Sequence, residues 1–239
     1  MNYSPGNFTV EIKPYADNGK LFVALSTEIK DAKIWYTTDG AEPTLQSHLY
    51  TGPIAVQSTQ WIKAKLSVNN TIKGLQAAKQ YFSMHQAVGK PVSYVKPYSK
   101  YYPAAGPNTL TDGVRGTDAI GKNWRGFTDG DLIASIDLGA NRNIHSITLG
   151  CLQHYKDWIF LPSAVQFETS TDGTNFTVLG TVPSPVSLEE KSVIYDFKIN
   201  APATPIRYIR VHAKNNLCPK GHSGEGKPGW IFADELVVE

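Results

Sequence analysis

The sequence predicts an all-β protein built from two β-sandwiches. No stretch of about 12 residues carries the apolar spacing i, i+3, i+4, i+7 that an amphipathic helix needs. Short alternating runs rich in Val, Ile, Thr and Tyr are instead separated by Gly, Pro, Asn and Asp, a pattern typical of strands and turns. The triplet Thr-Asp-Gly occurs four times, ending at Gly40, Gly113, Gly130 and Gly173. Its spacing is irregular, so the triplets are interpreted as turns.

Length and charge exclude several classes of protein. A chain of 239 residues fits one large or two small domains. A net charge of +2 is too weak to indicate a nucleic-acid partner. No apolar run approaches the roughly 18 residues that a membrane-spanning helix needs, so no membrane insertion is expected. Cys151 and Cys218 are too far apart in sequence for a metal or redox motif. Cys151 lies in the apolar run ITLGCL, where a free cysteine packs as a small hydrophobic residue, so we expect free thiols. We also expect a monomer.

The first predicted domain covers residues 1–86. Its strands alternate apolar and polar residues, so each has one buried face. Six short strands at regular spacing fit a small immunoglobulin-like sandwich. The predicted strands are Phe8–Lys13, Leu21–Ser26, Lys33–Thr37, Pro53–Val56, Gln60–Ser67 and Gly74–Phe82.

The second predicted domain covers residues 87–239. It begins with a segment rich in Pro and Tyr, which does not suit a central strand because Pro lacks a backbone donor. The strands that follow, with long loops between them, fit a jelly-roll sandwich of about eight strands. They are predicted at Leu132–Leu138, Ile144–Leu152, Ala164–Thr169, Phe176–Val182, Lys191–Ile199, Arg207–His212 and Trp230–Val238.

Motifs in the first domain resemble a known accessory module. The run IWYTTDGAEPTLQSHLYTGPIAVQSTQWIKAKL contains a YTxDG turn, a Pro-Thr pair, a Pro-Ile strand and an Ile-Lys-Ala strand. It resembles the small β-sandwich found C-terminal to the catalytic domains of chitobiases and β-hexosaminidases. The resemblance implies a module with no chemistry of its own.

A second resemblance covers residues 89–239. The motifs GKPVSY, LTDGVRGT, NWRGF, DLIASIDLG, HSITLGCLQ, WIFLP, VQFETSTDGTNF, RYIRVHA and ADELVV follow one another in that order. They resemble a discoidin, or coagulation-factor 5/8 C-type, domain, and more narrowly a family 32 carbohydrate-binding module. Together the two modules resemble the C-terminal tail of a bacterial family 20 β-hexosaminidase. That implies a periplasmic, extracellular or cell-surface location within a longer exported protein.

The loop Leu110–Thr117 is a candidate calcium site. Ca²⁺ takes six to eight oxygen ligands, and tight turns can direct backbone carbonyls toward one point. This loop offers the Leu110 carbonyl, the Asp112 carboxylate and the Thr117 hydroxyl. Glu235, on the last strand, could add a carboxylate, and the second resemblance implies such a structural calcium. The alternative is that Asp112-Gly113 is only a turn and Glu235 is only solvated.

Two loops are candidates for glycan binding. A sugar site needs an aromatic face and a few planar hydrogen-bonding groups. The loops 153–161 and 214–229 supply both, and the resemblance implies N-acetylhexosamine or galactose ligands. The alternative is that the two tryptophans are core residues. The candidates are His154, Tyr155, Asp157, Trp158, Asn215 and Trp230.

No catalytic set is found in this chain. Asp234-Glu235 resembles the adjacent acid pair of family 20 hexosaminidases, but neighbours on an alternating strand point to opposite faces. We therefore predict a non-catalytic tail that holds a parent glycoside hydrolase on glycans by raising the effective concentration. The alternative is a structural pair of modules that packs on the catalytic domain or another protein without binding sugar. Burial of Tyr155, Trp158 and Trp230 would favour that alternative, and Trp124 is predicted to be structural.

Overall fold

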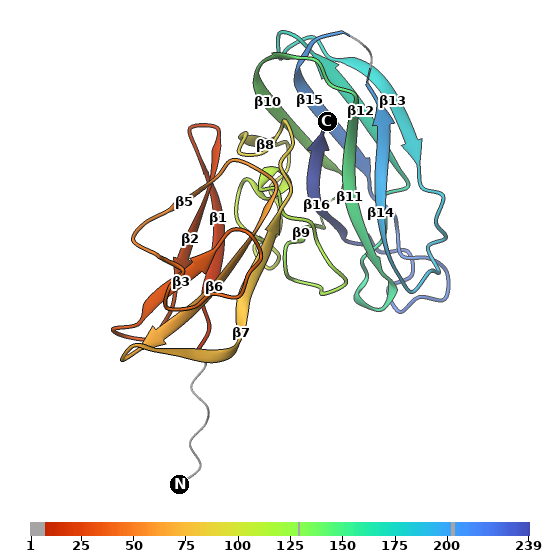
Figure 1. Ribbon diagram of the computed structural model, residues 1–239. Helices are drawn as coiled ribbons and strands as arrows, with labels where there is room; N and C mark the ends of the chain where they lie inside the picture. The colour runs from red at the N-terminus through yellow and green to blue at the C-terminus, as the bar shows by residue number, and fades with distance from the viewer. Residues whose placement is uncertain (1–7, 129, 202–203) are drawn as a thin grey trace. The chain divides into compact units, whose positions relative to one another are not determined.

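A computed structural model describes residues 8–128, 130–201 and 204–239 (Figure 1). The predicted fold class is confirmed, because nearly all regular structure in these residues is β-strand. The chain divides into two compact units, Met1–Met84 and His85–Glu239. This boundary lies before the predicted one at residue 86. His85 Nε2 lies 2.8 Å from Glu235 Oε1, and Gln86 N donates to Val238 O, so both residues belong with the last strand of the second unit.

The first unit contains two antiparallel sheets, coloured red to yellow in Figure 1. Their apolar residues alternate along each strand, and Leu21, Val23, Ile62 and Leu66 are almost fully buried. One sheet has the order β1-β2-β5, with β1 at Glu11–Asp17, β2 at Lys20–Ser26 and β5 at Ile54–Val56. The other has the order β4-β3-β6-β7, with β4 at His48–Leu49, β3 at Lys33–Thr37, β6 at Gln60–Val68 and β7 at Thr71–Phe82.

The second unit also contains two sheets. One has the order β13-β12-β15-β10-β8, with β13 at Thr177–Pro183, β12 at Ala164–Ser170, β15 at Ile206–Lys214, β10 at Leu132–Arg142 and β8 at Val92–Tyr94. The other has the order β14-β11-β16-β9, with β14 at Ser192–Asn200, β11 at Ser146–His154, β16 at Ile231–Val238 and β9 at Arg125–Phe127. The short strands β4, β8 and β9 were not predicted.

Strand β11 is central to the second unit. It pairs with β14 on one side and β16 on the other, and every residue but His154 is buried. Ile147, Leu149 and Cys151 belong to the main apolar cluster. Gly150 faces the other way, where a Cβ would meet Asp234 Oδ1 at 2.1 Å. The sheet is therefore covered by packed side chains on both faces.

Two further observations concern the described residues as a whole. Cys151 and Cys218 are both buried and free, and burial raises the pKa of each thiol. Within the ranges that the structure covers, the only helices are the short 3₁₀ segments η1 (Thr109–Thr111) and η2 (Tyr155–Asp157), and none could cross a membrane.

Candidate functional site

The two predicted glycan loops lie against each other at one end of the second sandwich. Strand β11 runs two residues further than predicted and ends at His154. The helix η2 follows, and Trp158 then adopts a left-handed conformation with φ 63° and ψ 19°. That turn lets Ile159 pair with His154 on one side and with Trp230 on the other. Trp230 N donates to Trp158 O at 2.8 Å, which joins the loops through the backbone.

His222 holds the second loop onto the first. Its Nδ1 accepts from Gly224 N at 3.0 Å, so Nε2 carries the proton and donates to Tyr155 O at 2.8 Å. Its ring meets those of Tyr155 and Trp158 edge-on, with centroids 4.6 Å and 5.7 Å away. The side chain is only 6% exposed. The sequence prediction did not assign His222 this role, and its position as the only histidine of the glycine-rich loop was the available signal.

Trp158 rests on a glycine of the opposite loop. A Cβ at Gly224 would lie 2.7 Å from the Trp158 ring, so this close approach requires glycine. Lys227 Nζ lies 5.7 Å from the ring centroid. Nearby, His154 Nδ1 lies 2.5 Å from Asp157 Oδ2. The first loop therefore places an aromatic ring and a polar pair within five consecutive residues.

Trp230 belongs to a different aromatic cluster. Its ring meets Tyr102 edge-on at 5.2 Å and Phe232 at 6.1 Å. It packs against a buried group that contains Trp124 and Ile159. Trp230 packs with Ile159, whereas His222 packs with the next residue, Phe160. Neighbouring residues of an extended segment point to opposite sides, so Trp230 and His222 lie on opposite sides of this segment. The structure thus separates Trp230 from the ring of Trp158.

Asn215 is engaged within its own loop. Its Nδ2 donates to Gly229 O at 2.9 Å, and its Oδ1 accepts from Asn216 N at 2.8 Å. Its backbone N–H donates to Asp131 Oδ1 at 2.8 Å. These bonds close the long loop at its base, which is a structural use of the amide group.

The three aromatic candidates are neither fully buried nor fully exposed. Tyr155, Trp158 and Trp230 each fall in the intermediate range. Complete burial was the result expected from purely structural modules, and it is not observed. Each residue retains some accessible surface, beside the polar His154–Asp157 pair or the Tyr102 ring.

The predicted metal carboxylates meet inside the protein. Glu235 and Asp112 are 1% and 4% exposed. Glu235 Oε1 accepts from Gly113 N at 3.1 Å, and Asp112 Oδ1 accepts from Val114 N at 2.9 Å. Burial raises the pKa of both carboxyl groups well above their usual range, and the charge of Glu235 raises that of Asp112 further. Glu235 Oε2 is buried without a hydrogen-bond partner among the described residues.

The other two predicted metal ligands are Leu110 and Thr117. Leu110 is fully buried in the main apolar cluster, so only its carbonyl could serve a metal. Thr117 is exposed, its hydroxyl accepts from Ala119 N at 3.3 Å, and its carbonyl accepts from Trp124 Nε1 at 2.7 Å. In the described ranges no hydrogen bond joins Thr117 to Asp112, and no group of three or more His, Cys, Asp or Glu residues could hold a metal by itself.

Asp234 and Glu235 point to different partners, as predicted for neighbours on a strand. Asp234 Oδ2 accepts from Arg115 Nε and Gly116 N, both at 2.8 Å. Arg115 also pairs with Asp196. Burial raises the pKa of Asp234, and Arg115 opposes that shift. The two acids therefore serve separate contacts and do not form a pair.

Trp124 and Arg125 are both fully buried beside the Leu110–Thr117 loop. Arg125 Nη2 donates to Pro103 O at 2.9 Å and to Thr109 Oγ1 at 3.0 Å. Its guanidinium lies 3.5 Å from the ring centroid of Tyr98. Carbonyls, a hydroxyl and an aromatic face thus surround the buried cation, although Arg125 Nε has no hydrogen-bond partner among the described residues. These contacts give both residues a structural role.

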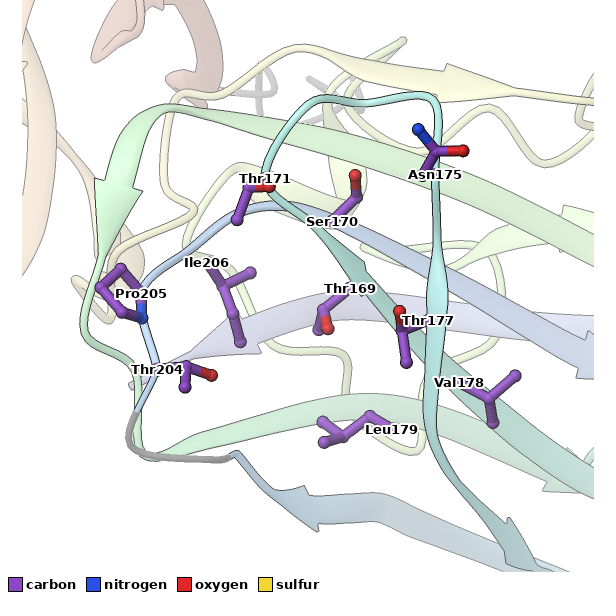
Figure 2. Close-up of a pocket in the computed structure, with 10 residues that line it drawn as sticks. All are labelled: Thr169, Ser170, Thr171, Asn175, Thr177, Val178, Leu179, Thr204, Pro205 and Ile206. Carbon is purple, nitrogen blue, oxygen red and sulfur yellow. The ribbon is translucent and has the colours of Figure 1, made fainter.

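A cavity of 330 Å³ lies at the opposite end of β12 and β15 from the two glycan loops (Figure 2). Figure 2 shows Thr169, Thr177 and Thr204 around it, with Leu179 and Ile206 as apolar neighbours. Among the residues that the structure describes, those that line it are neither charged nor aromatic. None of the predicted site residues lines it, so the predicted glycan surface is distinct from this hollow.

Comparison with known proteins identifies one family segment. Residues 16–74 match the family model of the chitobiase/beta-hexosaminidase C-terminal domain, which confirms the first resemblance over that segment. The search of curated proteins finds no match.

Several solved structures are similar to the chain. Chitosan-binding module 1 of a chitosanase/glucanase from Paenibacillus sp. IK-5 is 19% identical, with 65% of this chain and 98% of that chain covered and a TM-score of 0.43. CBM32-3 from a family 31 glycoside hydrolase of Clostridium perfringens is 17% identical, with 62% and 88% covered and a TM-score of 0.43. The lectin domain of lectinolysin complexed with Lewis B antigen is 15% identical, with 66% and 97% covered and a TM-score of 0.43.

Proposed function

We propose that this chain is a non-catalytic accessory region whose second sandwich binds glycans. The observation that carries the proposal is the joined pair of loops at residues 153–161 and 214–230. His222 contacts both Tyr155 and Trp158, and these two residues stay partly accessible next to the polar His154–Asp157 pair. An aromatic face beside fixed hydrogen-bonding groups is what a sugar ring needs. The proposed ligands are glycans of the N-acetylhexosamine or galactose type.

Trp230 offers a second aromatic surface in this proposal. Its ring stands edge-on to Tyr102 and lies on the other side of the Ile159 segment from Trp158. A glycan that extends over the rim of the sandwich would contact both rings, whereas a single sugar would contact one. The two tryptophans are therefore expected to contribute separately to affinity.

The proposed context is a β-N-acetylhexosaminidase-like glycoside hydrolase that is exported by a bacterium. The match of residues 16–74 to the chitobiase/beta-hexosaminidase C-terminal domain supports this parent. Weak sugar binding would suffice there, because a tethered catalytic domain works at a high effective concentration near its substrate. The location would then be periplasmic, extracellular or on the cell surface.

We also propose a structural calcium ion beside Asp112 and Glu235. Two buried carboxylates in one site are expensive without a compensating cation, and Glu235 Oε2 has no partner among the described residues. Backbone carbonyls such as that of Leu110, and Thr117 after a local adjustment, would complete the oxygen set. Bound calcium would supply the missing positive charge. Asp112 and Glu235 would then hold the loop Leu110–Thr117 against strand β16.

Isothermal titration of the whole chain with N-acetylglucosamine, N-acetylgalactosamine and galactose oligosaccharides tests the glycan proposal. We expect millimolar or tighter binding, weakened by Trp158→Ala and by Trp230→Ala. Tyr101→Ala is the matched control, because Tyr101 is an aromatic residue 74% exposed and outside both loops. Absence of binding at millimolar sugar, with no effect of either tryptophan variant, would instead support modules that pack on a protein partner.

A further inference from the structure

The outer face of the β4-β3-β6-β7 sheet carries a pair of aromatic side chains that do not pack into the buried core. Trp61 and Tyr81 oppose each other on β6 and β7, with ring centroids 5.1 Å apart and planes tilted by 53°. Trp61 is 38% exposed and Tyr81 is 43% exposed. Gly40 lies beside the indole, where a Cβ would be 3.6 Å from Trp61 Cδ1, and it has no side chain to cover the ring. Two large rings therefore remain open on this face.

Lysines stand next to this pair. Lys63 and Lys79 oppose each other two residues further along the same strands, so they lie on the same face as the rings. Like charges directly opposite each other destabilise a sheet. Glu42 pairs with Lys63 at 3.1 Å and with Lys65 at 3.3 Å, which leaves one carboxylate for three ammonium groups. Within the described ranges, no carboxylate lies within ion-pair distance of Lys79.

The other sheet of the same sandwich provides an internal comparison. Tyr15 and Phe22 form a cross-strand pair on the outer face of β1 and β2, 5.8 Å apart. On one side of that pair the charges are of opposite sign, because Asp17 opposes Lys20, and on the other side Lys13 opposes the uncharged Ala24. Such a pair is accounted for by sheet stability alone. The outer face that carries Trp61 differs because it has two lysines opposite each other. Sheet stability alone does not explain that lysine pair.

We propose that Trp61, Tyr81, Lys63 and Lys79, here called the basic aromatic face, bind an acidic polysaccharide. The C–H face of a sugar ring would lie on the aromatic pair, whose π-faces carry negative charge. A carboxylate or sulfate ester on the sugar would lie between Lys63 and Lys79 and remove their repulsion through charge-assisted hydrogen bonds. The excess of ammonium groups selects an anionic ligand, and the flat rings select a sugar over a bare ion.

Affinity electrophoresis of the full chain tests this proposal, in gels that contain polygalacturonate, heparin or neutral dextran. We expect retardation in polygalacturonate if carboxylates are recognised and in heparin if sulfates are recognised, and none in dextran. Trp61→Ala and Lys79→Gln should each weaken retention by about threefold to tenfold, and added salt should weaken it further. Tyr15→Ala is the matched control and should retain the wild-type affinity.

Several results would overturn the proposal. One is equal mobility of the protein in all three gels. Another is that Tyr15→Ala loses as much retention as Trp61→Ala. A third is that poly-L-glutamate binds as tightly as the polysaccharide and that Trp61→Ala does not weaken this binding. The last result would indicate an acidic protein partner. Thermal unfolding of each variant is measured alongside. Lys79→Gln changes an exposed side chain, so it keeps the test decisive even if Trp61→Ala unfolds the module.

Discussion

Replacing Asp112 with Asn is expected to change stability in opposite directions with and without calcium. Asp112 and Glu235 are buried in one site, and neutralising Asp112 removes a like charge from beside Glu235. An Asn side chain keeps an oxygen that can accept from Val114 N. Without metal the variant should therefore be as stable as the wild type or more stable. With calcium it should be less stable, because an anionic ligand is lost.

The size of each effect follows from these contacts. Calcium at 100 times its dissociation constant stabilises a folded protein by about 2.7 kcal/mol. In a unit the size of residues 85–239, this corresponds to a rise in melting temperature of about 5–10 °C. Relief of the buried like-charge contact in the metal-free variant is worth on the order of 1 kcal/mol, or a few degrees.

Differential scanning calorimetry in EDTA and in calcium measures both effects. One transition of the wild type should move upward with calcium, and the same transition of Asp112→Asn should move little. Asp137→Asn is a control, since its carboxylate pairs with Arg207 far from the loop in sequence and should leave the calcium shift intact. The reasoning is refuted if calcium shifts neither transition of the wild type, or if Asp112→Asn destabilises the protein in EDTA.

Two further predictions concern a close contact and a surface ion pair. Gly116→Ala should lower the free energy of unfolding by about 1–3 kcal/mol, because its Cβ would lie 2.2 Å from the buried Trp124 ring. Chemical denaturation measures this loss, and Gly52→Ala, where a Cβ meets open space, should show none. Hydrogen bonds from Arg207 hold the pKa of Asp137 below its usual range. The pair therefore stabilises the folded protein at pH values above the ordinary Asp pKa, and this contribution is lost as the pH falls through the lowered pKa. Arg207→Gln should raise the Asp137 pKa in an NMR titration, and an unchanged pKa would contradict the assignment.

Strands with clear alternation could be predicted from the sequence. Lys33–Thr37 and Leu21–Ser26 were predicted with the correct termini or within one residue, because their apolar residues recur every second position. Strands β8 and β9 were missed, since three residues are too few to show a period and pairing with β10 and β16 creates them. Strand β11 extends to His154 because Ser192 of β14 pairs with it, a partner 38 positions away in the chain.

The candidate sites were predicted only in part. Local sequence placed Tyr155, Trp158 and the loop at Leu110–Thr117 on turns, where the structure also has them. It did not show that Trp230 packs with Tyr102, or that Asn215 is consumed by bonds within its own loop. Those outcomes depend on backbone pairings between segments that are distant in sequence.

The sequence by itself determined that the chain forms two all-β units, since period-two alternation and turn residues are local properties. It also determined that the second unit carries aromatic and acidic loops. Only the tertiary structure decided which of those side chains meet. Glu235 reaches Gly113, and His222 reaches Tyr155, because sheet pairing brings these elements together. In the first unit, the pairing of β6 with β7 likewise places Lys63 opposite Lys79, beside the exposed Trp61–Tyr81 pair. The register between two strands decides which charges face each other, and no single strand encodes that register.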